Sequence, residues 1–167
     1  MEGVGEYDVA KMMSKIPHPY KKQDAINYLK MAIKRWKQKK ADDYTFFIEL
    51  KSEKKIIGAL GLHRIDWFSG VGATGSWINK KYWRNGFMTE AKIAVNDFAF
   101  NKLKLRRLDS DVYTDNVASN ATQKTMGYKL EGTQKKKIRT LSTGKIHDLN
   151  MYGLLKEDWK KARRKLI

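Results

Sequence analysis

One stretch of the chain, Trp83–Thr89, places a glycine and an arginine directly before a predicted helix. Free N–H groups in the first turn of a helix bind phosphate oxygens, and the helix dipole favours the negative charge. Gly86 carries no Cβ atom, so the backbone can approach such a group closely. Arg84 adds positive charge beside it. The motif predicts phosphate binding, and an ordinary turn is the alternative interpretation.

A second stretch, Asp115–Ser119, starts another predicted helix, which Gly127 is expected to end. Asp and Asn side chains accept hydrogen bonds from free N–H groups at helix starts, so Asp115 or Asn116 is expected to be the cap. The pattern by itself assigns no further role to Asn116 or Ser119.

The chain offers few other groups for chemistry. It has no cysteine, which excludes disulfides, thiol nucleophiles and cysteine-ligated metals. Its three histidines, His18, His63 and His147, are far apart and lack metal-ligand spacing, so no metal site is expected. His147-Asp148 has the residue types of an orienting pair, but no Gly-x-Ser-x-Gly element supplies a nucleophile.

Predicted helices and strands surround these motifs. Apolar residues recur at three- and four-residue steps over residues 22–39 and along one face of residues 86–103, which predicts two helices. Shorter helices are expected at 4–14, 117–126 and 156–167, and strands at 44–50, 56–65, 75–79, 107–113, 128–139 and 145–155. This order predicts an α+β fold with a central, mostly antiparallel sheet.

Composition favours an ordered globule, expected to be a single domain over residues 1–167. Hydrophobic residues make up 41% of the chain, and only two residues are proline. No apolar run approaches the roughly 18 residues of a membrane span, and the first residues lack the pattern of a secretory signal. A cytoplasmic location is therefore expected.

The net charge is +17, with basic stretches at 34–40, 135–137 and 160–165. Such a surface attracts polyanions, which include nucleic acid, the ribosome, acidic peptides and a phosphate-rich cofactor. General solubilisation of the chain is the alternative explanation. Charge alone does not decide between these functions.

Loop, helix, strand and Asn-capped helix in this order resemble the GNAT N-acetyltransferases. The resemblance runs from Pro17 to Trp159 and is closest to the Rim-type enzymes, which acetylate the N-terminal alanine or serine of ribosomal proteins. The residues that carry it include Gly75-Ser76-Trp77-Ile78, Tyr82-Trp83, Gly86, Thr89-Glu90-Ala91, Leu105–Leu108, Asp115-Asn116, Ser119, Met126-Gly127-Tyr128, Glu131-Gly132 and Met151–Leu155.

The resemblance implies a GNAT fold: a curved mixed, mostly antiparallel sheet, flanked by helices, whose two central strands splay apart and hold acetyl-CoA in the gap. Trp77, Ile78 and Asn79 would line the strand beside the pantetheine arm of acetyl-CoA. The backbone N–H of Ile78 would stabilise the oxyanion of the tetrahedral intermediate.

The same resemblance assigns the loop and the second helix. The pyrophosphate would be wrapped by Arg84, Asn85, Gly86, Phe87, Met88 and Thr89. Asn116 would bond the pantetheine, and Ser119 would face the thioester sulfur. Lys124 would meet the adenosine phosphate.

Several positions depart from the family pattern. Met88 stands where a small residue is usual, so its side chain must point away from the pyrophosphate. Gln123 stands where many members have a tyrosine acid, and Ile138 and Ala73 stand where carboxylates occur. The usual first strand also has little room before residue 4, so the N-terminus is expected to be short.

The resemblance implies direct transfer of an acetyl group from acetyl-CoA to a primary amine. An α-amine has a pKa near 7.7–8.0 and a lysine near 10.4, so deprotonating a lysine costs about 3–4 kcal/mol more. Without an obvious base, a protein or peptide N-terminus is the expected acceptor, with Asp66 and Glu131 as candidate bases or structural residues.

Two other functions stay open. Within the same fold, the acceptor could be a small amine such as a polyamine or an antibiotic. In a different class, the chain could be a basic protein that binds nucleic acid or the ribosome and has lost catalysis. The sequence leaves open whether the protein is a monomer or a homodimer.

Overall fold

The computed structural model describes residues 3–38 and 40–166. Its helices are α1 (Tyr7–Ala10), α2 (Lys22–Trp36), α3 (Phe87–Asp97), α4 (Val117–Thr125) and α5 (Lys156–Arg163), with short helical turns η1 (Lys80–Tyr82) and η2 (Phe98–Lys102). Its strands are β1 (Tyr44–Leu50), β2 (Lys55–Asp66), β3 (Val71–Ile78), β4 (Arg107–Tyr113), β5 (Lys129–Arg139) and β6 (Ile146–Leu155).

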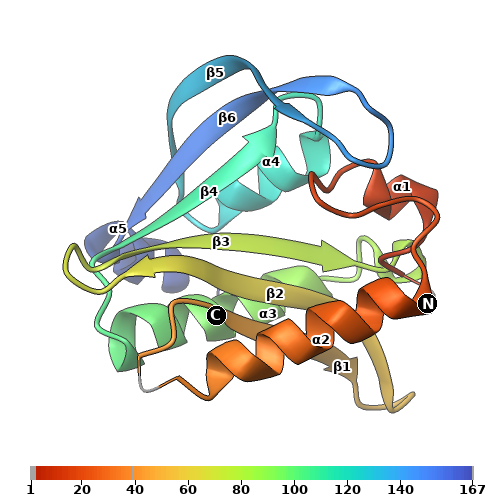
Figure 1. The fold of residues 1–167 in the computed structure, drawn as a ribbon. Coiled ribbons are helices and arrows are strands. Elements are labelled where there is room, and N and C mark those ends of the chain that lie inside the picture. The colour runs from red at the N-terminus through yellow and green to blue at the C-terminus, as the bar shows by residue number, and fades with distance from the viewer. Residues whose placement is uncertain (1–2, 39, 167) are drawn as a thin grey trace.

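The six strands form one sheet in the order β1-β2-β3-β4-β6-β5. Every neighbouring pair is antiparallel except β3 and β4, which are parallel. Strands β3 and β4 pair only where Val71–Ala73 meets Arg107–Asp109. Beyond those residues the two strands diverge, and Figure 1 shows the gap widening toward their arrowheads. The splayed central strands expected from the sequence are confirmed.

Helices cover both faces of the sheet. On the face called the front face here, the Tyr28 hydroxyl of α2 lies 3.0 Å from the Thr45 hydroxyl of β1. On the opposite back face, the Phe98 ring of η2 packs edge-on against Tyr44 and Phe46. These β1 side chains alternate between the faces because successive residues of a strand point to opposite sides. Figure 1 shows α2 in front of the sheet and α3 behind it.

The main core lies on the back face. Side chains from the sheet, η2 and α5 meet there, and the fully buried ones include Leu62, Phe100, Leu108, Leu154 and Trp159. Trp159 also donates a hydrogen bond from its indole nitrogen to Asp97 at 2.9 Å, which attaches α5 to α3. This core and the bond from Trp159 to Asp97 hold α3 against the back face of the sheet. The first turn of α3 lies on the side of the gap.

The α+β fold expected from the sequence is confirmed, with differences in several elements. The helix expected at 4–14 covers only Tyr7–Ala10, because the next residues close i→i+3 turns such as Met13 N–H to Ala10 O. Strand β3 begins at Val71, not at residue 75, because Val71 pairs with both β2 and β4.

Another difference is at the end of the long helix expected over 86–103. From Phe98 onward the turns are wider, with a bond from Leu103 N–H to Phe98 O, and this brings Ala99 and Phe100 into the core together. The helices expected over 22–39 and 156–167 end earlier, at Trp36 and Arg163. Lys39 and Ile167 themselves lie outside the described residues. None of the helices in the described ranges is long and apolar enough to cross a membrane.

Candidate active site

The glycine loop has the geometry of an anion-binding helix start. Gly86 is the N-cap of α3 with φ of 79°, in the left-handed region that favours glycine. A Cβ atom added to Gly86 would meet no atom within 4 Å, so the space above the loop is open. The Asn85 side chain donates to Trp83 O at 3.0 Å and holds the loop in shape.

The first turn of α3 leaves its N–H groups available. No side chain caps this helix, and its first backbone bond runs from Glu90 N–H to Gly86 O. The N–H groups of Phe87, Met88 and Thr89 precede that bond and point out of the helix start. Met88 is half-buried. A phosphate fits this helix start.

Basic side chains near the loop are partly engaged. The Lys80 ammonium lies 2.6 Å from Asp8 of α1, and that hydrogen bond raises the pKa of Lys80. Lys81 lies over the Tyr82 ring at 5.3 Å. Arg84 is exposed and has no ion-pair partner among residues 3–38 and 40–166. Arg84 is therefore the loop cation that is free to meet an anion.

The edge of β3 that faces the gap carries unpaired backbone groups. Asn79 N–H donates to Ile57 O at 2.8 Å, toward β2. Backbone groups of successive strand residues point to opposite edges, so Ile78 N–H points toward the gap. The Ile78 carbonyl points the same way and accepts a bond from the Trp83 indole at 2.9 Å. Among the described residues nothing bonds to Ile78 N–H, which is thus a donor for a molecule in the gap.

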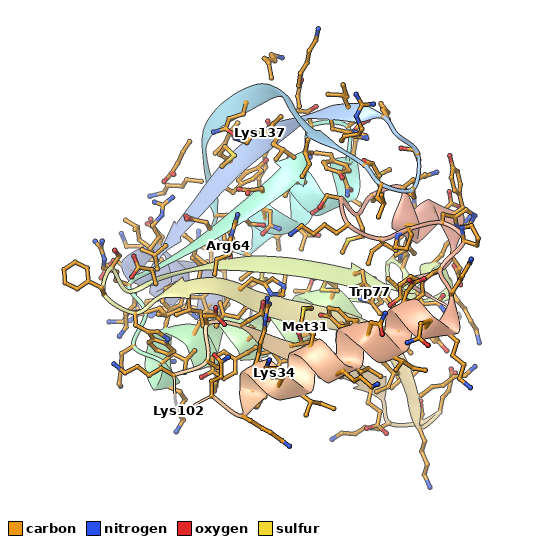
Figure 2. All side chains as sticks on the ribbon, in the orientation of Figure 1. Met31, Lys34, Arg64, Trp77, Lys102 and Lys137 are labelled. Carbon is orange, nitrogen blue, oxygen red and sulfur yellow. The ribbon has the colours of Figure 1, made fainter. Side chains whose placement is uncertain are left out.

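The neighbours of Ile78 have structural contacts of their own. A Cβ atom on Gly3 would lie 2.9 Å from the Trp77 ring, so the segment that begins at Gly3 packs on that side chain. Figure 2 shows Trp77 beside this segment. The Asn79 side chain accepts from Lys81 N–H at 2.9 Å and caps η1. The backbone N–H of Asn79 points toward β2, and alternation along β3 points that of Trp77 the same way, so of these three residues Ile78 alone presents its backbone to the gap.

Helix α4 starts at the end of β4 that borders the gap. Its cap is Asn116, whose side-chain oxygen accepts from Ser119 N–H at 3.1 Å, and Asp115 instead binds Lys145 at 2.6 Å. Asn116 keeps its amide NH₂ for a second contact, and the half-buried Ser119 lies in the same turn. Lys124 is exposed at the far end of α4.

The two candidate bases have structural partners. Glu131 receives two hydrogen bonds from the Arg107 guanidinium, at 2.8 and 2.5 Å, and this pairing lowers the pKa of Glu131. Asp66 accepts the N–H groups of Phe68 and Ser69 in the β2–β3 turn, and its bonds to Ser69 lower its pKa. Neither carboxylate lies free beside the gap.

The front face beside the gap carries acidic side chains, although the chain as a whole has a net charge of +17. Asp109 pairs with Ala73 and therefore shares its face, as does Asp111 two residues on. Asp109 receives a bond from Arg107 at 2.6 Å, and Asp111 lies 3.4 Å from Arg64. Figure 2 shows Arg64 at the start of the gap.

One candidate group escaped the sequence analysis. The His63 ring lies 2.8 Å from Asp43, and Arg35 binds the same carboxylate oxygen at 2.5 Å. These residues come from β2, the segment before β1 and α2, so linear spacing gives no sign of the cluster. The sequence offers one indication of this position: alternation along β2 places His63 on the same face as Gly61.

The protein thus has an α+β fold with a gap between two sheet strands and a helix start that no side chain caps. This combination suits an extended ligand that carries phosphate groups. Comparison with protein families makes this specific, because residues 4–129 match the Acetyltransferase (GNAT) domain. The chain belongs to the GNAT acetyltransferase family, as the sequence resemblance indicated. Acetyl-CoA is the co-substrate of that family.

Two curated relatives from Bacillus subtilis (strain 168) are similar to the chain. The uncharacterized N-acetyltransferase YoaA is 33% identical over 109 residues, which are 65% of this chain and 60% of YoaA. The putative ribosomal N-acetyltransferase YdaF is 28% identical over 135 residues, which are 81% of this chain and 73% of YdaF. The chain thus spans less than two thirds of the length of YoaA.

Solved structures share the fold. The ribosomal-protein-S5-alanine acetyltransferase from Vibrio fischeri superposes with a TM-score of 0.80 at 22% identity, covering 92% of this chain and 82% of that one. The microcin C7 self-immunity acetyltransferase MccE, solved with acetyl-CoA and AMP, gives 0.76 at 21% identity, covering 89% and 79%. The GNAT fold expected from the sequence is confirmed.

Proposed function

We propose that this protein transfers an acetyl group from acetyl-CoA to a primary amine, most readily the N-terminal α-amine of a protein or peptide. The observation that carries the proposal is the gap between β3 and β4, which opens beside the uncapped start of α3. Family membership and the name of YdaF support the reaction and the acceptor class. The cytoplasmic location and any contact with the ribosome stay predictions.

Different site residues would bind different parts of acetyl-CoA. The N–H groups of Phe87, Met88 and Thr89 would hold the pyrophosphate, with Arg84 as the nearby cation. Along the gap, the Asn116 amide would hold the pantetheine arm. Ile78 N–H would stabilise the oxyanion, Ser119 would face the leaving sulfur, and exposed Lys124 would meet the adenosine phosphate.

The acceptor would reach the gap from the front face. Three carboxylates stand there, Asp109, Asp111 and Glu131, against the two guanidinium groups of Arg64 and Arg107. This group carries one net negative charge on a chain of +17, so a cationic amine is not repelled from this part of the surface.

Replacing Gly86 with alanine is expected to weaken acetyl-CoA binding about 10- to 150-fold, since losing one hydrogen bond to a charged group costs about 1.5–3 kcal/mol. The new Cβ atom would occupy the open space that a phosphate needs. Calorimetric titration measures the change. Gly144→Ala is the matched control, because Gly144 also has a positive φ and open space around it, in the β5–β6 turn. Equal weakening in both variants would contradict the phosphate site.

Acetylation assays with paired peptides test the acceptor. One peptide carries a free N-terminus and no lysine, and the other carries a blocked N-terminus and one lysine. We expect kcat/KM at neutral pH to favour the free N-terminus by at least tenfold, because the lysine must lose a far more tightly held proton. Efficient acetylation of the lysine peptide with an inert N-terminal peptide would contradict the proposal.

The remaining outcomes point to the other functions. Micromolar binding of acetyl-CoA with transfer only to polyamines would make the protein a small-amine acetyltransferase. Binding to RNA with steep salt dependence, in the absence of acetyl-CoA binding, would indicate a basic nucleic-acid-binding protein.

A further inference from the structure

The imidazole of His63 lies on the front face at the start of the gap. A Cβ atom placed on Gly61 would stand 1.8 Å from its Nε2 atom, and one placed on Gly75 would stand 3.7 Å from it. Gly75 is the second residue after Ala73, the last residue of β3 that pairs with β4. Two glycines on neighbouring strands therefore leave the room that this ring fills, beside the point where β3 loses its partner.

The contacts of the ring determine which nitrogen can accept a proton. Burial acts to raise the pKa of Asp43, but the hydrogen bonds and charges of His63 and Arg35 outweigh burial and hold that pKa below its usual value. The ionised Asp43 carboxylate can only accept, so His63 Nδ1 donates to it at 2.8 Å. The neutral ring then keeps its lone pair on Nε2.

The Nε2 atom is accessible to a substrate. The His63 side chain is 32% exposed, whereas the Asp43 side chain behind it is 11% exposed. Within residues 3–38 and 40–166, no group forms a hydrogen bond with Nε2. The ring is thus held from one side by a buried carboxylate and open on the other, which is the arrangement that a general base needs.

We propose that His63 is the general base of the acetyl transfer and that Asp43 positions its ring. This inference rests on the proposed function, because it concerns the same gap. His63 Nε2 takes one proton from the acceptor ammonium, directly or through one water. The amine nitrogen then bonds to the acetyl carbon and the carbon–sulfur bond breaks. A second amine proton ends on the leaving sulfur, and His63 returns its proton to solvent.

The groups around the ring allow a cation to approach. Opposite the ring, β3 presents the uncharged Ala73 and Gly75. The titratable and charged side chains that face this region are Arg35 and Tyr28 from α2, Asp43 before β1, Arg64 from β2, and Arg107, Asp109 and Asp111 from β4. Each of the three arginines is bound to a carboxylate, so none stands unpaired toward Nε2.

The first test is His63→Asn, whose amide can still donate to Asp43 but cannot accept a proton. We expect kcat/KM for an N-terminal peptide to fall about 100-fold at neutral pH, in the range typical of general bases. Calorimetric binding of acetyl-CoA should stay within twofold. The deficit should shrink as pH rises, because the acceptor amine then loses its proton without help. His18→Asn removes an exposed histidine elsewhere and should change none of these values.

Two further variants separate a base from a structural residue. In His63→Ala, added imidazole should restore part of the rate, which a purely structural role does not predict. In Gly61→Ala the new Cβ atom displaces the ring, so kcat/KM should fall as in His63→Asn, and adding Gly61→Ala to His63→Asn should cost little more. Melting temperatures of all variants establish that they fold.

The outcomes distinguish the two proposals. A wild-type enzyme that acetylates peptides, with His63→Asn equally active across the pH range, would overturn the role of His63 and leave the proposed function intact. A wild-type protein that neither binds acetyl-CoA nor acetylates an amine would overturn the proposed function itself.

Discussion

Replacing Trp159 with alanine is expected to lower the free energy of unfolding by about 3–5 kcal/mol, the range for removing a buried tryptophan or phenylalanine. Trp159 is 2% exposed and packs in the same cluster as Phe100, Leu108 and Leu154. Its indole also holds Asp97 at the end of α3. The truncation would leave a large cavity and remove the attachment of α5. Chemical denaturation, monitored by far-UV circular dichroism because that signal comes from the backbone and not from tryptophan fluorescence, measures the change.

Phe68→Ala is the matched control for Trp159→Ala. Phe68 is 101% exposed at the β2–β3 turn, so its removal should change stability by no more than about 0.5 kcal/mol. Trp159→Phe should lie between the two, because it keeps one buried aromatic ring and loses the rest of the indole together with its bond to Asp97. A loss below 1 kcal/mol in Trp159→Ala would mean that α5 does not dock on the core.

Replacing Lys92 with methionine is expected to raise the free energy of unfolding at pH 7 by up to about 3 kcal/mol. Lys92 is 3% exposed on α3, and burial lowers its pKa from 10.5 to about 8. The difference between a pKa of 10.5 and a pKa of about 8 corresponds to about 3 kcal/mol, at 1.36 kcal/mol for each pKa unit. Methionine has a similar length and no charge, so it removes the cost of burying the ammonium group.

The pH dependence gives the sharper test of Lys92. Between about pH 8 and 10.5 the unfolded chain binds a proton at Lys92 that the folded chain has released, so this residue makes stability rise with pH in that window. The advantage of Lys92→Met should therefore be complete below pH 8 and vanish above 10.5. The exposed Lys102 supplies the control, since Lys102→Met should leave stability unchanged at every pH. A pH-independent difference would contradict the assignment.

Local patterns predicted most of the elements. The aromatic and β-branched residues of 44–50 and the alternation of 107–113 predicted strands whose bounds agree with β1 and β4, and Gly127 follows α4 after one capping residue. The loop before α3 and the cap of α4 were also identified from residue types alone, because helix ends follow local rules. Family resemblance supplied the splayed strands, which no periodicity indicates.

Tertiary contacts explain what the sequence did not predict. The wide turns at Phe98–Lys102 depend on which side chains the core accepts, so helical periodicity does not distinguish them from an ordinary helix. The early start of β3 depends on pairing with β4, over 30 residues later. The cluster of Asp43 and His63 joins residues 20 positions apart, and Glu131 is engaged by Arg107 from another strand. Clusters of residues that come from different strands cannot be recognised in any short segment of the sequence.

The short pairing between β3 and β4 also sets how the molecule can open. On one side of it, β1, β2 and β3 form an antiparallel unit, and on the other side β4, β6 and β5 form a second one. Only Val71–Ala73 and Arg107–Asp109 join them within the sheet. Within the sheet this joint is the weakest connection between the two halves, and the back-face core, which includes Leu62 and Leu108, holds them together as well. A ligand bridging the gap would tie the halves together, and its binding energy would be added to the cost of separating them.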